Sequence, residues 1–233
     1  MSNEILNLKN PAPLREIDQL AKEYQSATVD CQAQFELMAI TANAVSELKK
    51  RLPDEMVQQL KKLENTKLGF RTDKEQGYDS STIRDCMIEA VLRGVKPIGN
   101  EFNIIAGNFY LTKEGFTGLM NREQRLTELK LNLGVPKFEN NRAVVGYTTS
   151  WKWDGQSDSM EGEVPIKLNK GMGDDAVLGK AERKVRARIW AQATGNAQPE
   201  GEVVDYDRMQ RAEPVQPAED AFAPAYKAEG GVE

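Results

Sequence analysis

The stretch CMIEAVLRGVKPIGNEFNIIAGNFYLTKEGFTGLM, residues 86–120, decides the fold. Apolar residues recur from Ile83 to Gly94 at the spacing of a helix that buries one face, and residues 80–82 (Ser-Ser-Thr) are candidate N-caps. Gly94 is suited to end this helix in a left-handed conformation, and Pro97 prevents its continuation. The stretch therefore opens with a helix and a sharp corner.

A hairpin and a second helix follow directly. Short apolar segments at residues 102–104 and 109–111 flank Ala106-Gly107-Asn108, a turn sequence typical of a β-hairpin. Residues 113–118, KEGFTG, then lead into another helix start. The order of helix, corner, hairpin and helix predicts a mixed fold with local antiparallel pairing.

Apolar residues at helical spacing predict three helices before this stretch. The residues that define the three expected buried stripes are Leu14, Ile17, Leu20, Ala21 and Tyr24; Phe35, Met38, Ala42, Val45, Leu48 and Leu52; and Met56, Val57, Leu60 and Leu63. Residues 67–80 carry turn residues without a period, which predicts a loop. Its aromatic residues Phe70 and Tyr78 either contact a nucleic acid or anchor the loop, and we expect them to anchor it.

Three strands are predicted in series after residue 120. They cover residues 126–133, 143–153 and 164–168, and the second places Val145, Tyr147, Thr149, Trp151 and Trp153 on one face. The short connections, including the Asp154-Gly155 turn, indicate an antiparallel meander. The sequence thus predicts an α+β fold: a small antiparallel β-sheet, made of the hairpin plus a three-stranded meander, packed with helices. A helical N-terminal section precedes it and a disordered acidic C-terminal tail follows.

The expected organisation is a helical section at residues 1–66, an α+β core at 67–195 and a tail at 196–233. From Glu200 onward the chain has nine acidic and three basic residues, a charge of −6, so the rest of this −5 protein carries +1. The tail also has several prolines and few large apolar residues, a composition that does not support a core. The acidity is a property of the tail and does not argue against nucleic-acid binding by the core.

The absence of histidine excludes several kinds of site. With no histidine, Ser-His-Asp and Cys-His catalysis and imidazole zinc ligation are impossible. Cys31 and Cys86 alone cannot make a tetrahedral zinc site, and we expect both to be reduced structural thiols. Residues 173–181, GDDAVLGKA, have neither the spacing nor the hydroxyl of a phosphate-binding loop, so no ATP site is predicted. No cofactor or metal is expected.

The sequence also lacks membrane and export signals. No apolar run approaches the length of a membrane span, and the N-terminus has no apolar segment typical of a secretion signal. We therefore expect a cytoplasmic protein without a membrane partner.

Two blocks of sequence resemble the phage RecT / Red beta family of single-strand DNA annealing proteins. The first combines R-G-V-K-P, the hairpin and E-G-F-T-G-L-M; the second is GKAERKVRARIWAQATG at residues 179–195. The resemblance covers about residues 83–195. It implies a non-catalytic recombination protein of a bacterial host cell that binds single-stranded DNA and anneals complementary strands without ATP.

The resemblance also implies a set of partners. These are single-stranded DNA, the annealed duplex intermediate and further copies of the chain in a ring or helical filament. A partner exonuclease or a host single-strand-binding protein is a further possible partner.

The predicted DNA contacts centre on one basic helix. It carries Lys180, Arg183, Lys184, Arg186 and Arg188 against the single acid Glu182. A solvated helix normally mixes charges for pairing one turn apart, so we expect these bases to bind phosphates; a plain charged surface is the alternative. A buried stripe of Leu178, Ala181, Val185 and Ile189 would fix their row at the edge of a groove between the helix and the sheet.

The first block contributes three more candidate contacts. By resemblance, Lys96 and Lys113 lie close to the site, and Thr117 stands where relatives often carry a base. Phe116 is expected in the core. Two other functions stay open: a magnesium-dependent nuclease built on Glu101, Glu128 and Lys130, and a non-DNA assembly or scaffold protein.

Overall fold

The computed structural model describes residues 12–29, 31–169 and 171–195. The described residues belong to one compact unit, and the predicted tail at 196–233 lies outside the described residues.

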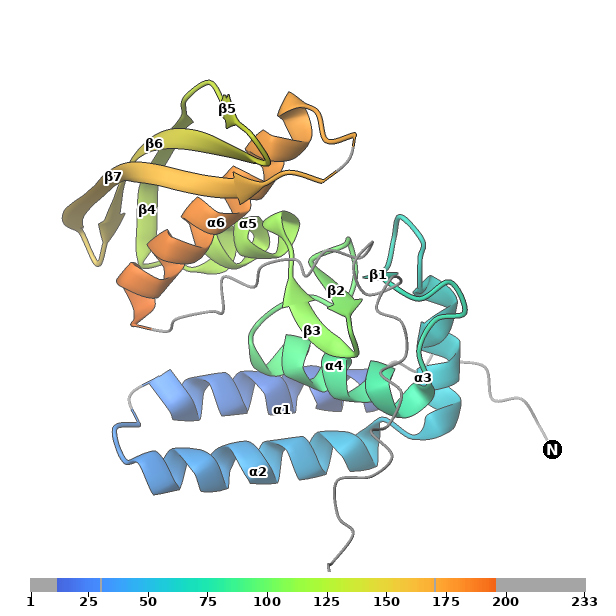
Figure 1. Cartoon of the computed structure of the whole chain (residues 1–233). Helices are drawn as coiled ribbons and strands as arrows, with labels where there is room; N and C mark the ends of the chain where they lie inside the picture. Colours follow the sequence, from blue (N-terminus) through green and yellow to red (C-terminus); the bar gives the residue numbers. More distant parts are fainter. Residues whose placement is uncertain (1–11, 30, 170, 196–233) are drawn as a thin grey trace, which may run out of the picture. The chain divides into compact units, whose positions relative to one another are not determined.

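The described chain is a mixed α+β structure, as predicted from the sequence (Figure 1). Its elements are α1 (Ala12–Val29), α2 (Gln34–Arg51), α3 (Asp54–Leu60), the short 3-10 helix η1 (Lys61–Leu63), β1 (Arg71–Thr72), α4 (Ser80–Leu92), β2 (Phe102–Ile105), β3 (Asn108–Leu111), α5 (Lys113–Arg122), β4 (Leu126–Leu133), β5 (Lys137–Glu139), β6 (Arg142–Trp153), β7 (Gln156–Lys167) and α6 (Asp174–Thr194).

The first hydrophobic core joins the N-terminal helices to the hairpin. β2 and β3 pair antiparallel, and the two-residue β1 adds to β2 in parallel. Side chains from α2, α3, α4 and β2 meet in this core; its most buried members include Leu48, Val57, Phe70, Ile83 and Phe102. The predicted boundary at residue 66 therefore does not separate two cores.

The second core lies between a sheet and α6. β6 is the central strand, with β4 and β5 along one edge and β7 along the other, all antiparallel. The alternation predicted for β6 is confirmed, because Val145, Tyr147, Thr149 and Trp151 are all buried. These side chains face α6, which crosses this side of the sheet (Figure 1).

Four local features differ from the sequence-based expectations. The two-residue strand β1 lies inside the predicted loop at residues 67–80. α4 is capped by Asp79, whose carboxylate accepts a hydrogen bond from Thr82 N at 2.8 Å, and not by a residue of the Ser-Ser-Thr segment. β5 was not predicted, because its residues are exposed and show no apolar period. β7 begins at Gln156, eight residues before Val164, since its polar first half is held by β6 alone.

The predicted buried stripe of α2 is wrong in its N-terminal half. Phe35 is 87% exposed and Met38 is 66% exposed, whereas Ala44 and Leu48 are buried. The helix has apolar residues on two faces, and periodicity does not say which face meets the core. Packing against α1 and α4 buries the face that carries Ala44 and Leu48, and leaves Phe35 and Met38 exposed.

Candidate nucleic-acid interface

Helix α6 carries most of the predicted DNA contacts. It begins after Gly173 with Asp174 and Asp175 in its first turn, where carboxylates stabilise a helix N-terminus. It ends at Gly195, which takes the left-handed conformation at φ 71° and so matches the glycine expected at this position. Of the predicted apolar stripe, Ala181, Val185 and Ile189 are buried in the second core; Val177 is buried in place of Leu178.

α6 is not a surface helix. From residue 177 to residue 191 every position is buried or half-buried. One side packs on the sheet, and other side chains contact α5 and the hairpin core. In the described part of the chain, apolar side chains of the second core fill the space between α6 and the sheet where a groove was predicted. The physical reason is that the buried stripe is wide enough for direct contact with the sheet.

Two predicted contacts lie on the β7 side of α6. Lys184 Nζ donates to the carbonyl of Pro165 at 3.2 Å, and Arg188 NH1 donates to the carbonyl of Glu163 at 3.3 Å. Both carbonyls belong to the free edge of β7, where Pro165 also removes an N–H donor. The two half-buried cations thus occupy carbonyl groups on the edge of β7 that does not pair with β6. Lys180 is half-buried on the same helix.

Two further cations contact one carboxylate on the opposite side, and a third, Arg183, stacks on a tyrosine ring. Glu182 accepts both Arg186 Nε at 3.0 Å and Arg186 NH2 at 2.8 Å, and Lys113 Nζ of α5 lies 3.5 Å from its other oxygen. Arg183 is only 7% exposed, and its guanidinium carbon lies 4.8 Å from the ring centre of Tyr110. Burial raises the pKa of Tyr110, while the charge of Arg183 acts in the opposite direction. We call Lys113, Glu182, Arg183, Arg186 and Tyr110 the Glu182 cluster.

The E-G-F-T-G motif is built tightly against Glu101. A Cβ on Gly115 would overlap the backbone carbonyl of Glu101, and one on Gly118 would lie 2.6 Å from its carboxylate. Phe116 is fully buried in the first core, as expected. Thr117 is half-buried and donates within α5 to the carbonyl of Lys113 at 2.9 Å. The motif fixes the start of α5, and with it Lys113, beside α6.

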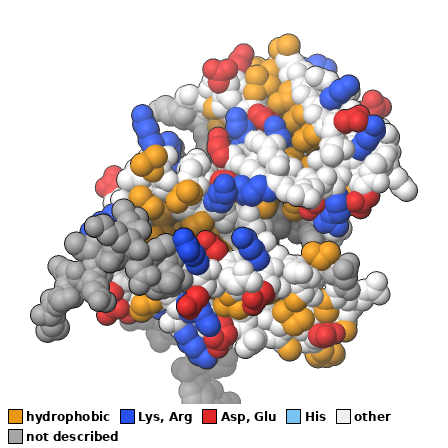
Figure 2. All heavy atoms as spheres, turned by 180° about the vertical axis from the view of Figure 1, so that it is seen from behind, with side chains coloured by type: hydrophobic (Ala, Val, Ile, Leu, Met, Phe, Trp, Pro, Cys, Tyr) orange, Lys and Arg blue, Asp and Glu red, His pale blue; other side chains and the backbone are white. Residues whose placement is uncertain are grey.

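The predicted contact residues therefore fall into separate groups. Lys113, Arg183 and Arg186 come together in the Glu182 cluster, and Lys184 and Arg188 line the β7 edge. Lys96 is exposed at the corner before β2, where its backbone N–H donates to the Glu101 carboxylate at 2.9 Å. Basic side chains are visible across the middle of the face seen in Figure 2.

Sequence reasoning missed two members of the Glu182 cluster as site residues. Glu182 was counted only as the single acid of the helix, and Tyr110 only as part of a strand. Tyr110 faces α6 because β3 pairs with β2 in a fixed register, with Asn103 opposite Tyr110. The only sequence signal for the direction of the Tyr110 side chain was the alternation of β3, since alternate residues of a strand share a face.

The two carboxylates of the nuclease hypothesis, Glu101 and Glu128, both form ion pairs with basic side chains of this chain. Glu101 is bonded to Arg122, and Glu128 accepts a hydrogen bond from Lys152 Nζ at 2.6 Å. Among the described residues, no three His, Cys, Asp or Glu side chains form a group that could hold a metal ion. The geometry gives the nuclease hypothesis no support.

Within the described ranges no helix has the length and apolar character needed to cross a bilayer. Comparison with protein-family models, with curated proteins and with solved structures finds no match to this chain.

Proposed function

We propose that this protein binds single-stranded DNA through α6 and its surroundings and anneals complementary strands without ATP. The observation that carries the proposal is the Glu182 cluster, where Lys113 and Arg186 both contact the partly buried carboxylate of Glu182. Arg186 and Glu182 are 17% and 26% exposed, and Lys113 is 39% exposed. Two cations at one partly buried carboxylate leave a net positive charge, and a bound anion would compensate it. A phosphate backbone supplies such anions at regular spacing.

The sheet suggests how the bases would be left free to pair. Tyr147 and Trp151 of β6 point into the second core, so the opposite face of the sheet presents Val144, Gly146, Thr148 and Ser150. Modules that stack bases use aromatic side chains on an open face, and none of these four residues of β6 is aromatic. Contacts to phosphates alone would hold the strand without regard to sequence. Watson–Crick pairing would then select the complementary strand.

Annealing over a long strand also needs several copies of the chain. One domain of this size covers few nucleotides, on the order of 4–16 in comparable modules. We therefore include a homo-oligomer, a ring or a helical filament, in the proposal. The annealed duplex, a partner exonuclease and a host single-strand-binding protein remain partners implied by the resemblance.

The first experiment is a titration of a labelled oligonucleotide over a series of salt concentrations. The test variant is Lys113→Ala/Lys184→Ala, one cation from each side of α6. The control variant is Lys50→Ala/Lys62→Ala, which removes the same charge from exposed positions near α3. Each lost phosphate contact lowers the log–log salt slope by about 0.7 for single strands, so the test variant should flatten the slope by somewhat over one unit.

The two variants separate local contacts from net charge. The test variant should weaken binding on the order of 10-fold at low salt and equally for unrelated sequences, while the control variant binds like the wild type. Unfolding free energies should change by no more than about 1 kcal/mol, as is usual for surface ion pairs whose charges still reach solvent. Equal affinity and slope in all three proteins would remove the basis for the interface.

The same titration separates the other functions. Degradation of the oligonucleotide on addition of magnesium would indicate a nuclease. Absence of any salt-dependent binding would indicate a non-DNA assembly protein. Annealing itself is measured by quenching between labelled complementary strands without ATP, and the test variant should anneal more slowly than the control variant.

A further inference from the structure

Helix α2 has an apolar face that the described chain does not cover. Phe35, Met38, Ala39 and Ala42 are all exposed, and their spacing of i, i+3, i+4 and i+7 puts them on one side of the helix. Val29 at the end of α1 is also 60% exposed. We call the four α2 residues the outer stripe. This pattern is the one by which an amphipathic helix inserts into a groove of a partner.

The outer stripe lies in a stretch of the chain without basic residues. Between Lys22 and Lys49 there are four acidic residues and no basic residue, and one of the acids, Glu47, pairs with Lys50 and Arg51. Glu36 follows Phe35 beside the stripe and is exposed. In Figure 2 hydrophobic side chains gather at the lower right, the side to which the α1–α2 turn moves in this view. A partner for this surface should be apolar and rimmed by positive charge.

The same chain carries such a surface elsewhere. Leu68 is 74% exposed and Ile98 is 50% exposed. Their loops are held side by side, because Gly99 N donates to the carbonyl of Leu68 at 2.9 Å. Lys67 and Lys96 are exposed beside them. We call Leu68, Ile98, Lys67 and Lys96 the Leu68 surface.

The surroundings of the Leu68 surface are basic. Residues 61–74 contain five basic and two acidic residues. Both acids are turned to internal partners: Glu64 accepts from Tyr78 N at 3.0 Å, and Asp73 accepts from Tyr78 Oη at 2.6 Å. The surface is therefore complementary in charge to the outer stripe.

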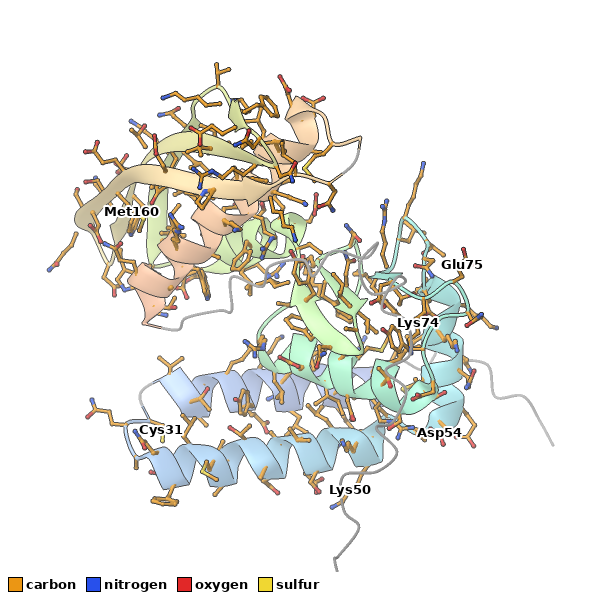
Figure 3. All side chains as sticks on the ribbon, viewed as in Figure 1. Cys31, Lys50, Asp54, Lys74, Glu75 and Met160 are labelled. Atoms are coloured by element: carbon orange, nitrogen blue, oxygen red, sulfur yellow. The ribbon has the colours of Figure 1, made fainter. Side chains whose placement is uncertain are left out.

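The two surfaces are too far apart to meet within one chain. Phe35 stands at the first turn of α2, and the Leu68 surface follows α3, beyond the other end of α2. From Phe35 to Arg51 the helix extends roughly 24 Å at 1.5 Å per residue. Figure 3 shows Cys31 at one end of the α1–α2 pair and Lys50 and Asp54 at the other. Two different, complementary and separated surfaces on one chain produce head-to-tail contacts between copies.

We infer that the outer stripe of one copy docks on the Leu68 surface of a second copy. The contact joins unlike surfaces, so it leaves one of each surface free for the next copy and propagates as an open chain or a ring. The apolar area is small, so a single contact is weak and is strengthened when copies stand side by side on a strand. The contact itself does not rest on the proposed DNA function, although it would supply the alignment that annealing needs.

The test is a mixing experiment with the full chain, read by sedimentation velocity over a concentration series. One variant, Phe35→Asp/Met38→Asp, disables the outer stripe; the other, Leu68→Asp/Ile98→Asp, disables the Leu68 surface. All four side chains are at least half exposed, so both variants should keep the circular dichroism and melting temperature of the wild type. The control is Val135→Asp/Phe138→Asp, an equally exposed apolar pair near β5.

The wild type and the control should grow in mass with concentration, and each test variant alone should remain a monomer. An equimolar mixture of the two test variants should give a dimer and nothing larger, because each supplies the surface that the other lacks. If only the α2 variant is monomeric and mixing changes nothing, the stripe pairs with itself and the inference is wrong. A wild type that stays monomeric at all concentrations, or test variants that assemble normally, also overturns it.

Binding of an oligonucleotide long enough for one copy distinguishes this inference from the proposed function. The Phe35→Asp/Met38→Asp variant should bind it like the wild type, because its changes lie on α2, away from α6 and Lys96. If no protein binds it while head-to-tail assembly occurs, the DNA proposal fails and the assembly contact stands.

Discussion

Glu101 and Arg122 form a two-point ion pair in which Arg122 NH1 and NH2 lie 2.8 and 2.7 Å from the two carboxylate oxygens. The Glu101 side chain is only 12% exposed. Arg122 NH2 also donates to the carbonyl of Gly94, at 3.0 Å. The pair therefore connects the corner after α4 to the last turn of α5. The corner and the E-G-F-T-G helix both contact the carboxylate of Glu101.

Replacing Arg122 with Ala should lower the free energy of unfolding by about 1–3 kcal/mol, because a largely buried carboxylate loses its charged donors. Adding Glu101→Gln to this variant should recover part of the loss, since the unpaired charge is then gone. Urea unfolding of the two single variants and the double variant gives the coupling energy. Strictly additive effects would mean that the ion pair does not stabilise the fold.

The two glycines of the E-G-F-T-G motif should respond differently to alanine. In Gly115→Ala the new methyl group meets the backbone carbonyl of Glu101, which cannot move freely, so a loss of about 1–3 kcal/mol or more is expected. In Gly118→Ala it meets the ends of the Glu101 and Arg122 side chains, which can shift, and the gain in helix propensity offsets part of the cost. In thermal unfolding, the Gly118→Ala variant should have a clearly higher melting temperature than the Gly115→Ala variant. The reverse order would contradict this packing.

The two cysteines should differ sharply in reactivity. Burial, followed by the negative charges of Glu89 and Asp85, raises the pKa of Cys86 to about 12, whereas the Cys31 side chain is partly accessible. Because the thiolate is the reactive form, a disulfide reagent at neutral pH should modify one thiol per native chain and both after unfolding. The Cys31→Ser variant should lose the native reaction, and the Cys86→Ala variant should keep it. Rapid native labelling of Cys86 would show that α4 opens.

Stability should fall at alkaline pH in a way that depends on Tyr78. Burial, aided by its hydrogen bond to Asp73, raises the pKa of Tyr78 to about 12, above its usual value of about 10. A raised folded-state pKa gives stability that is complete below about pH 10 and is lost as the pH rises toward 12. The Tyr78→Phe variant should be less stable at pH 8, since Asp73 and Gly107 N each lose a hydrogen bond to the Tyr78 hydroxyl, but its stability should decline less between pH 10 and 12. Parallel curves for the two proteins would contradict this role for Tyr78.

The sequence by itself determined the elements whose pattern is local. The alternation of β6, the hairpin turn at Ala106-Gly107 and the glycine end of α4 at Gly94 all appear where they were expected. Each depends on a period of two residues or on a backbone conformation that glycine favours at a turn. The fold class followed from the order of these elements.

The tertiary structure decided which faces are buried and which charges meet. α2 is apolar on two sides, so only its packing on α1 and α4 shows that Phe35 faces outward and Leu48 inward. The bases of α6 were visible in the sequence, but their division into the Glu182 cluster and the β7 edge was not. Residues distant in sequence, such as Lys113 and Glu182, become neighbours only when α5 and α6 pack together. Periodicity records which residues share a face, whereas burial and ion pairing depend on contacts between elements, and no local pattern encodes those contacts.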